Sequence, residues 1–151
     1  MKNRLIIDQL DKRFNDLSKI SNMDIPASGW LASVRKALGM SLEQFGKRLS
    51  ITRQSAKELE QREKDGSLSI RSLREAAAAM DMQLVYWIVP KDGSLDALIE
   101  RKAKEIATSI VMRTSNTMKL EDQENSTKRI QEAIKERTRV IKQEMPKILW
   151  D

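Results

Sequence analysis

The stretch SLEQFGKRLSITRQSAKELE, residues 41–60, predicts two short helices joined by a tight turn. Ser41 is followed three residues later by Gln44, which is the pattern of a capping box at the start of a helix. That helix is expected to end before a turn at residues 50–52, and Thr52 is the expected N-cap of the second helix. Two short helices and the turn between them make a helix-turn-helix unit.

Further helices are predicted on both sides of this unit. Pro26 suits the first turn of a helix over about residues 27–38, which Gly39 would terminate. After the turn signal Asp65-Gly66, Ser69 is the expected N-cap of another helix. These flanking helices would complete a small hydrophobic core.

An amphipathic helix is predicted near the N-terminus, before a linker at residues 21–26. Its apolar residues recur at three- and four-residue spacing, and they are Ile6, Leu10, Phe14, Leu17 and Ile20. The pattern leaves two roles open for this helix. It either packs on its own domain or is exchanged with a partner chain as an arm.

Residues 82–89, MQLVYWIV, are predicted to form a β-strand, because β-branched and aromatic residues are enriched there and Pro90 closes the run. A lone strand leaves backbone groups unpaired. The segment would therefore pair with its copy in a two-fold dimer, with another strand of the same chain, or with a partner protein. The dimer or partner strand would consist of Leu84, Val85, Tyr86, Trp87 and Ile88.

Two long helices are predicted in the C-terminal part of the chain. The first begins at the N-cap Ser94 and carries an apolar stripe as far as Ile110. The second covers residues 128–145, and an apolar tail follows it. Residues 114–127 are polar and fit either a loop or a continuing helix.

The composition excludes several kinds of chemistry. The 151 residues contain no Cys and no His, which removes disulfides, thiolate nucleophiles, His/Cys zinc sites and histidine acid–base catalysis. No Gly-rich phosphate loop, metal cluster or nucleophile–base pair is visible. We therefore expect a protein that is not an enzyme and has no cofactor. Because no signal peptide and no membrane-spanning apolar run is visible, we expect a cytoplasmic protein without a membrane partner.

The charge favours a polyanionic partner. The net charge is +6, and residues 1–66 carry 13 basic and 9 acidic side chains. The second helix of a helix-turn-helix unit can enter the DNA major groove, where its first residues reach base edges. The candidate DNA-binding residues are Thr52, Arg53, Gln54, Ser55, Lys57 and Arg62, with Lys47 and Arg48 as phosphate contacts.

These residue types suit base recognition, since Arg bonds guanine, Gln bonds adenine and Ser bonds either base. The inner face of the same helix would carry Ala56, Leu59 and the aliphatic stem of Gln54. A competing interpretation is that the outer face is an ordinary charged surface in contact with water. Periodicity and capping alone do not separate the two interpretations.

Residues 41–60 resemble the Cro/repressor-type helix-turn-helix, the family also called xenobiotic response element. The resemblance implies that Gly46 is the family's small residue in the first helix of the unit. It also implies that Glu60 steadies the second helix against the core. Leu42 stands where the family commonly has a Gln that contacts a phosphate.

A wider resemblance covers nearly the whole chain, which is similar to the bacterial family named mobile mystery protein A. The segments that carry it are Gly29-Trp30, Ala37-Leu-Gly-Met-Ser41, Leu84-Val-Tyr86 with Val89-Pro90, Thr117-Met-Lys-Leu-Glu-Asp-Gln123 and Leu149-Trp150. The resemblance implies pairing with a Fic-domain toxin in a toxin–antitoxin-like module. This chain would be the antitoxin and the autorepressor of its own operon.

Fic inhibitors commonly carry a Ser/Thr-x-x-x-Glu-Gly/Asn helix. The nearest match here places Thr117 four residues before Glu121, and Asp122 follows instead of Gly or Asn. This stretch would otherwise be a cap or packing motif, with the Fic partner bound elsewhere. The candidate toxin contacts are Thr117, Leu120, Glu121 and Trp150.

We therefore expect a mainly α protein, with a five-helix-type Cro/repressor core, one β-strand and long C-terminal helices. Residues 1–25 would form the N-terminal helix and linker, residues 26–90 the DNA-binding domain, and residues 91–151 a helical region for dimer or toxin contact. A homodimer would read a palindromic double-stranded operator. The competing function is a protein-interaction inhibitor of the Fic partner that does not read DNA.

Overall fold

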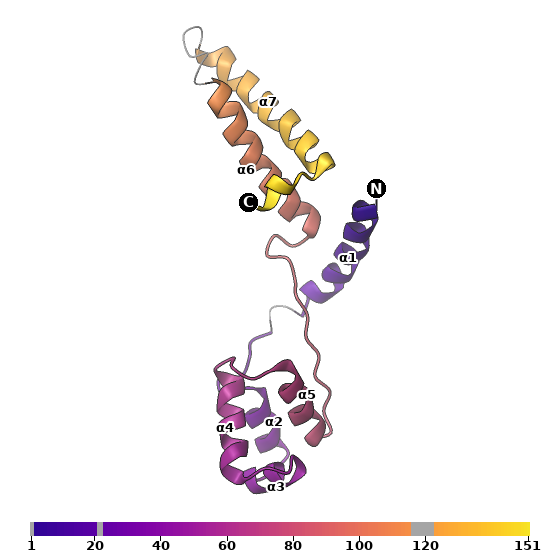
Figure 1. The fold of residues 1–151 in the computed structure, drawn as a ribbon, viewed down its shortest axis with the longest axis vertical. Helices are drawn as coiled ribbons and strands as arrows, with labels where there is room; N and C mark the ends of the chain where they lie inside the picture. The colour runs from indigo at the N-terminus through magenta and orange to yellow at the C-terminus, as the bar shows by residue number, and fades with distance from the viewer. Residues whose placement is uncertain (1, 21–22, 116–122) are drawn as a thin grey trace. The chain divides into compact units, whose positions relative to one another are not determined.

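The computed structural model describes residues 2–20, 23–115 and 123–151 and is mainly helical, which confirms the expected fold class (Figure 1). The chain divides into two compact units. We call residues 23–87 the central unit, and residues 1–22 with 88–151 the terminal unit. The N-terminal helix thus belongs with the C-terminal helices, a grouping that the sequence did not indicate.

The central unit contains four helices, which are α2 (Trp30–Ala37), α3 (Leu42–Arg48), α4 (Arg53–Lys64) and α5 (Ile70–Ala79). The fifth helix of the expected five-helix core is not found in residues 23–87. Three helices begin at the predicted hydroxyl N-caps, where Ser41, Thr52 and Ser69 accept hydrogen bonds from backbone N–H groups of the first turn. Helix α2 begins at Trp30 rather than near Ala27, because Gly29 is its N-cap.

The four helices enclose one hydrophobic core. Its buried residues come from every helix and from the end of α5, and they are Leu31, Phe45, Ala56, Ala76 and Met80. Phe45 is fully buried and is the largest side chain at the centre of the core. The small Ala side chains allow α4 and α5 to pack closely around it.

The turn between α3 and α4 is tight and closely packed. Ser50 lies in the left-handed region with φ of 56°, and the N–H of Ile51 donates to the carbonyl of Gly46 at 2.9 Å. The N–H of Ser50 also donates to the carbonyl of Lys47 at 3.1 Å. The two hydrogen bonds together form a Schellman motif, which ends α3. A Cβ atom on Gly46 would lie 2.8 Å from the carbonyl oxygen of Ile51. Gly46 is therefore required for the close approach of the turn.

The predicted strand at residues 82–89 is wrong. This segment has no regular secondary structure, and no strand occurs in the part of the chain that the structure describes (Figure 1). Leu84 is half-buried, whereas the other four predicted strand side chains are exposed, up to 84% for Ile88. A strand forms only when its backbone N–H and C=O groups find a partner ladder. High β-propensity without such a partner leaves an irregular segment.

The terminal unit contains α1 (Lys2–Ser18), α6 (Leu95–Ser115), α7 (Gln123–Glu144) and the short 3-10 helix η1 (Lys147–Trp150). Helices α6 and α7 pack against each other along their length (Figure 1). The core of this unit consists of Ile7, Ile99, Ala103, Ala107, Ile141 and Leu149. Helix α1 therefore packs on α6 of its own chain, the first of the two roles left open by its sequence.

Candidate nucleic-acid interface

The inner face of α4 is held to α2 by a buried ion pair. The guanidinium of Arg35 donates through Nε to Glu60 Oε1 and through Nη2 to Glu60 Oε2, the latter at 3.2 Å. The Arg35 and Glu60 side chains are only 9% and 10% exposed. A third bond, from Arg35 Nη1 to the Met40 carbonyl at 2.8 Å, leaves the buried guanidinium well satisfied. Glu60 thus holds α4 against α2, as the resemblance to the Cro/repressor-type helix-turn-helix implied.

A second carboxylate fixes the next turn of α4. Glu63 accepts hydrogen bonds from the backbone N–H of Trp30 at 3.1 Å and of Leu31 at 3.4 Å, which are free donors at the start of α2. Gly29 permits this contact, because its φ is +81° and a Cβ atom would overlap the Glu63 carboxylate. Glu60 and Glu63 together hold α4 against α2 over nearly one helical turn.

The outer face of α4 presents cations at its start. Arg53, Gln54 and Lys57 are exposed. The side chains of Arg53 and Lys57 form no hydrogen bond or ion pair with any residue within the described ranges. Gln54 donates to the Glu58 carboxylate at 3.2 Å. Gln54 therefore belongs to the exposed face, and the prediction that its stem lies on the inner face is wrong.

Thr52 and Ser55 build the start of α4. The Thr52 hydroxyl oxygen accepts the Ser55 N–H at 3.0 Å, and the Thr52 hydroxyl donates to Ser55 Oγ at 2.9 Å. Ser55 is half-buried. Both predicted DNA-binding residues therefore have a structural function as the cap, and only one hydroxyl hydrogen, that of Ser55, is left for another acceptor.

The remaining predicted cations differ in how they are held. Lys47 is 77% exposed on α3 and lies 3.7 Å from Glu43. Arg48 instead donates to the Ala79 carbonyl at 3.0 Å and contacts Asp81, so it neutralises the C-terminal end of α5. Arg62, near the end of α4, donates to the Ser67 carbonyl at 3.3 Å. Lys47 is thus the cation of this group that is most available to a phosphate.

Sequence analysis missed Glu58, which the structure places beside Gln54 on the exposed face. The four-residue spacing of the two side chains on one helix was the signal that could have identified the pair. A similar pair follows about two turns further along, where Gln61 donates to Asp65 at 2.9 Å. The exposed face therefore carries carboxylates as well as cations.

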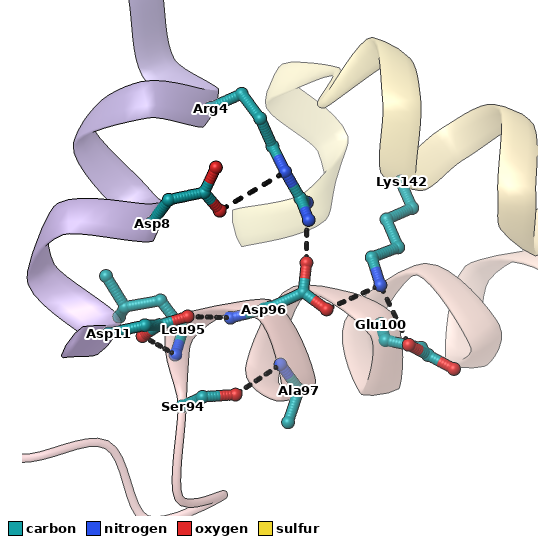
Figure 2. Close-up of polar contacts among 9 residues, drawn as sticks. All are labelled: Arg4, Asp8, Asp11, Ser94, Leu95, Asp96, Ala97, Glu100 and Lys142. Atoms are coloured by element: carbon teal, nitrogen blue, oxygen red, sulfur yellow. Dashed lines mark hydrogen bonds and ion pairs between the residues drawn. The ribbon is translucent and has the colours of Figure 1, made fainter. Parts of the chain in front are cut away.

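The terminal unit holds a second polar cluster, which joins α1, α6 and α7 (Figure 2). Asp11 of α1 accepts the N–H groups of Leu95 at 2.6 Å and Asp96 at 3.1 Å, so α1 caps α6. Asp96 in turn accepts hydrogen bonds from Lys142 at 2.8 Å and Arg4 at 2.5 Å. These contacts lock the three helices together.

The pKa shifts in this cluster are those of a structural ion pair rather than of groups that transfer protons. The hydrogen bond from Lys142, with that from Arg4, holds the pKa of Asp96 below its ordinary value. The carboxylate hydrogen bonds raise the pKa of Lys142, first that to Asp96 and then that to Glu100. A general acid or base needs a pKa near neutrality. Both shifts move away from neutrality, so neither group is suited to that role.

A cavity of about 740 Å³ opens between α1 and α7 beside this cluster. Its lining includes three cations, and each already faces a carboxylate. Arg4 and Lys142 contact Asp96, and Arg139 contacts Glu136 at 2.6 Å. Among the residues that the structure describes, no group of three or more acidic side chains is arranged to hold a metal ion.

The predicted toxin contacts are only partly visible. Thr117, Leu120 and Glu121 lie outside the described residues. Trp150 is 56% exposed at the end of η1, next to the buried Leu149. None of the described helices is both long enough and apolar enough to cross a membrane.

Comparison of the chain with protein-family models, with curated proteins and with solved structures found no match.

Proposed function

We propose that this chain is a sequence-specific DNA-binding transcriptional regulator that reads the major groove with the first turns of α4. The observation that carries the proposal is the contrast between the two faces of that helix. Its inner face is fixed by Glu60 and Glu63, whereas Arg53 and Lys57 project from the outer face without partners among the described residues. A rigid helix with free cations at its start fits a Cro/repressor-type reader.

The side chains divide into two roles. In the proposal, Arg53 bonds a guanine edge and Lys47 on α3 contacts a phosphate. Arg53→Ala is expected to cost about 1–3 kcal/mol of binding free energy and to relax preference at one base position. Lys47→Ala is expected to weaken all duplexes alike and to lower the salt dependence by about one phosphate contact.

Gel-shift titrations at rising salt, with the region upstream of the protein's own coding sequence and with unrelated duplexes, test both roles. Arg71→Ala is the matched control, because Arg71 is 88% exposed on α5 and the substitution also removes one positive charge. We expect the control to retain wild-type preference. Equal losses on all duplexes for Arg53→Ala and Lys47→Ala would contradict the division of roles.

The antitoxin role rests on the resemblance to mobile mystery protein A. In this part of the proposal, the chain binds a Fic-domain toxin and represses the operon that encodes both proteins. Co-expression of the two proteins with a tag on the toxin tests the pairing. Co-purification in a stoichiometric complex is expected, and a toxin that elutes alone would contradict it.

The competing function is an inhibitor that binds the Fic protein through the same fold without reading DNA. The carboxylates Glu58 and Asp65 on the outer face of α4 are the observation that favours it, because carboxylates repel phosphates. Specific DNA binding that weakens steeply with salt would exclude this alternative.

A homodimer would place two α4 helices about one DNA turn apart on a palindromic operator. The proposal therefore includes self-association of the chain. Sedimentation at micromolar concentration, with and without operator, tests it. If the chain is a monomer in both conditions, the proposed dimer and the proposed palindromic operator are both wrong.

A further inference from the structure

The outermost line of α4 is formed by polar side chains. Successive residues of an α-helix are rotated by roughly 100°, so four residues lie within about 40° of the side opposite the buried Ala56. They are Gln54, Glu58, Gln61 and Asp65, and all are exposed. We call these four residues the acceptor stripe.

The hydrogen bonds within the acceptor stripe determine which of its side-chain atoms can still accept hydrogen bonds. Gln54 Nε2 donates to Glu58 Oε1 at 3.2 Å, and Gln61 Nε2 donates to Asp65 Oδ1 at 2.9 Å and Oδ2 at 3.1 Å. In each pair the amide donates inside the protein, and Gln54 keeps its second N–H as a donor. The amide oxygen and the remaining carboxylate lone pairs are left to accept hydrogen bonds from outside.

Cations lie on both sides of the stripe. The same rotation per residue places Arg53, Lys57 and Lys64 along one side and Arg62 along the other, and all four are exposed. The exposed face thus has acceptors along its centre and positive charge at its edges. A DNA major groove has the complementary arrangement, with base edges at its floor and phosphates along its two rims.

We infer that the Gln54–Glu58 pair selects an amino-bearing base, adenine or cytosine, on one strand of the duplex. This inference rests on the proposed function and assigns base specificity to Glu58. In the major groove, adenine N6 and cytosine N4 donate hydrogen bonds, whereas guanine O6 and thymine O4 accept them. A carboxylate only accepts, so it bonds the first two bases and repels the carbonyl oxygens of the other two.

Glu58→Gln is the decisive substitution. It keeps the size and helix propensity of the side chain, but an amide both donates and accepts. The preference for cytosine over guanine and thymine should therefore disappear at one position, whereas adenine, which a Gln bonds, is still accepted. Loss of a negative charge should also raise the affinity for every duplex by a similar factor. The effect of charge therefore changes the overall affinity, whereas the effect of base recognition changes the preference among duplexes.

The experiment selects bound duplexes from a randomised pool with the wild-type chain and then titrates single base-pair changes in the selected duplex. For the wild type, we expect about a tenfold preference for adenine or cytosine over guanine or thymine at one position of one strand. For Glu58→Gln we expect the preference for cytosine over guanine or thymine to fall within about twofold. Glu75→Gln is the matched control, because Glu75 is an exposed acid on α5 that pairs with Arg71. It should keep the wild-type preference.

The outcomes separate the two claims. A Glu58→Gln chain that keeps the wild-type preference would overturn the inference and leave DNA binding intact. A wild-type chain that at no position accepts A·T and C·G alike over G·C and T·A would also overturn it. If the wild-type chain enriches no sequence from the pool, the proposed function itself fails, and the inference fails with it.

Discussion

At the scale of single residues, the Arg35–Glu60 pair is the contact on which the position of α4 most depends. Removing one member of a buried pair leaves an uncompensated charge, so Glu60→Ala should lower the free energy of unfolding by about 3–5 kcal/mol. Denaturant unfolding measures the loss. Glu75→Ala, which breaks the exposed pair with Arg71, should cost less than about 1 kcal/mol. Equal losses in the two variants would contradict the structural importance of the buried pair.

Gly46 is the second residue on which the helix-turn-helix unit depends. In Gly46→Ala the added methyl group would meet the Ile51 carbonyl, and the turn would have to open. We expect a loss of about 1–3 kcal/mol in unfolding free energy, although Ala has the higher helix propensity. Glu43→Ala on the exposed side of α3 should stay within about 0.5 kcal/mol. A Gly46→Ala chain as stable as the wild type would show that the turn has room.

At the scale of elements, α6 depends on α1 for its start. Asp11 satisfies two N–H groups that α6 would otherwise leave free. Asp11→Ala should therefore lower the stability of the terminal unit by about 0.5–2 kcal/mol. Hydrogen exchange read by mass spectrometry should show faster exchange in the first turn of α6. Unchanged exchange there would mean that the cap contributes little.

The contact of Asp96 with Lys142 and Arg4 makes the terminal unit sensitive to acid. Because the folded-state pKa of Asp96 is lowered, its contribution to stability is complete above the ordinary value of 3.8 and is lost as the pH falls through the folded-state pKa. Asp96→Asn should reduce the loss of stability below about pH 4. Asp16→Asn, an exposed position on α1, is the control. Urea unfolding reports on this unit when Trp150 is the only tryptophan, after Trp30→Phe and Trp87→Phe, and fluorescence is excited at a wavelength that Tyr86 does not absorb.

At the scale of the whole molecule, each unit has its own hydrophobic core. A chain segment with a closed core and satisfied helix caps is able to fold alone. The fragment 23–87 should therefore be helical and unfold cooperatively, with a stability of about 3–8 kcal/mol. Circular dichroism under urea measures this, and the Glu60→Ala fragment should unfold at a lower urea concentration than the wild-type fragment. A fragment without a cooperative transition would show that the central unit needs the rest of the chain.

Charge is not concentrated in the central unit, which carries ten basic and eight acidic side chains. The proposal of DNA binding therefore depends on where the charges lie rather than on their sum. Arg53 and Lys57 are exposed and unpaired among the described residues, whereas Glu60 and Glu63 are used inside the unit. Sequence counts treat all of these side chains alike.

The amino-acid sequence by itself determined the local features of the central unit. The N-caps Ser41, Thr52 and Ser69 and the turn at residues 50–52 lie where the pattern predicted them, because capping and turn geometry involve neighbours within a few residues. Only the tertiary structure decided which distant groups meet. The contacts of Arg35 with Glu60 and of Asp11 with the start of α6 join residues that lie far apart in the sequence. Residues 82–89 form no strand, because a strand requires hydrogen bonds to a partner strand, and local β-propensity does not supply that partner.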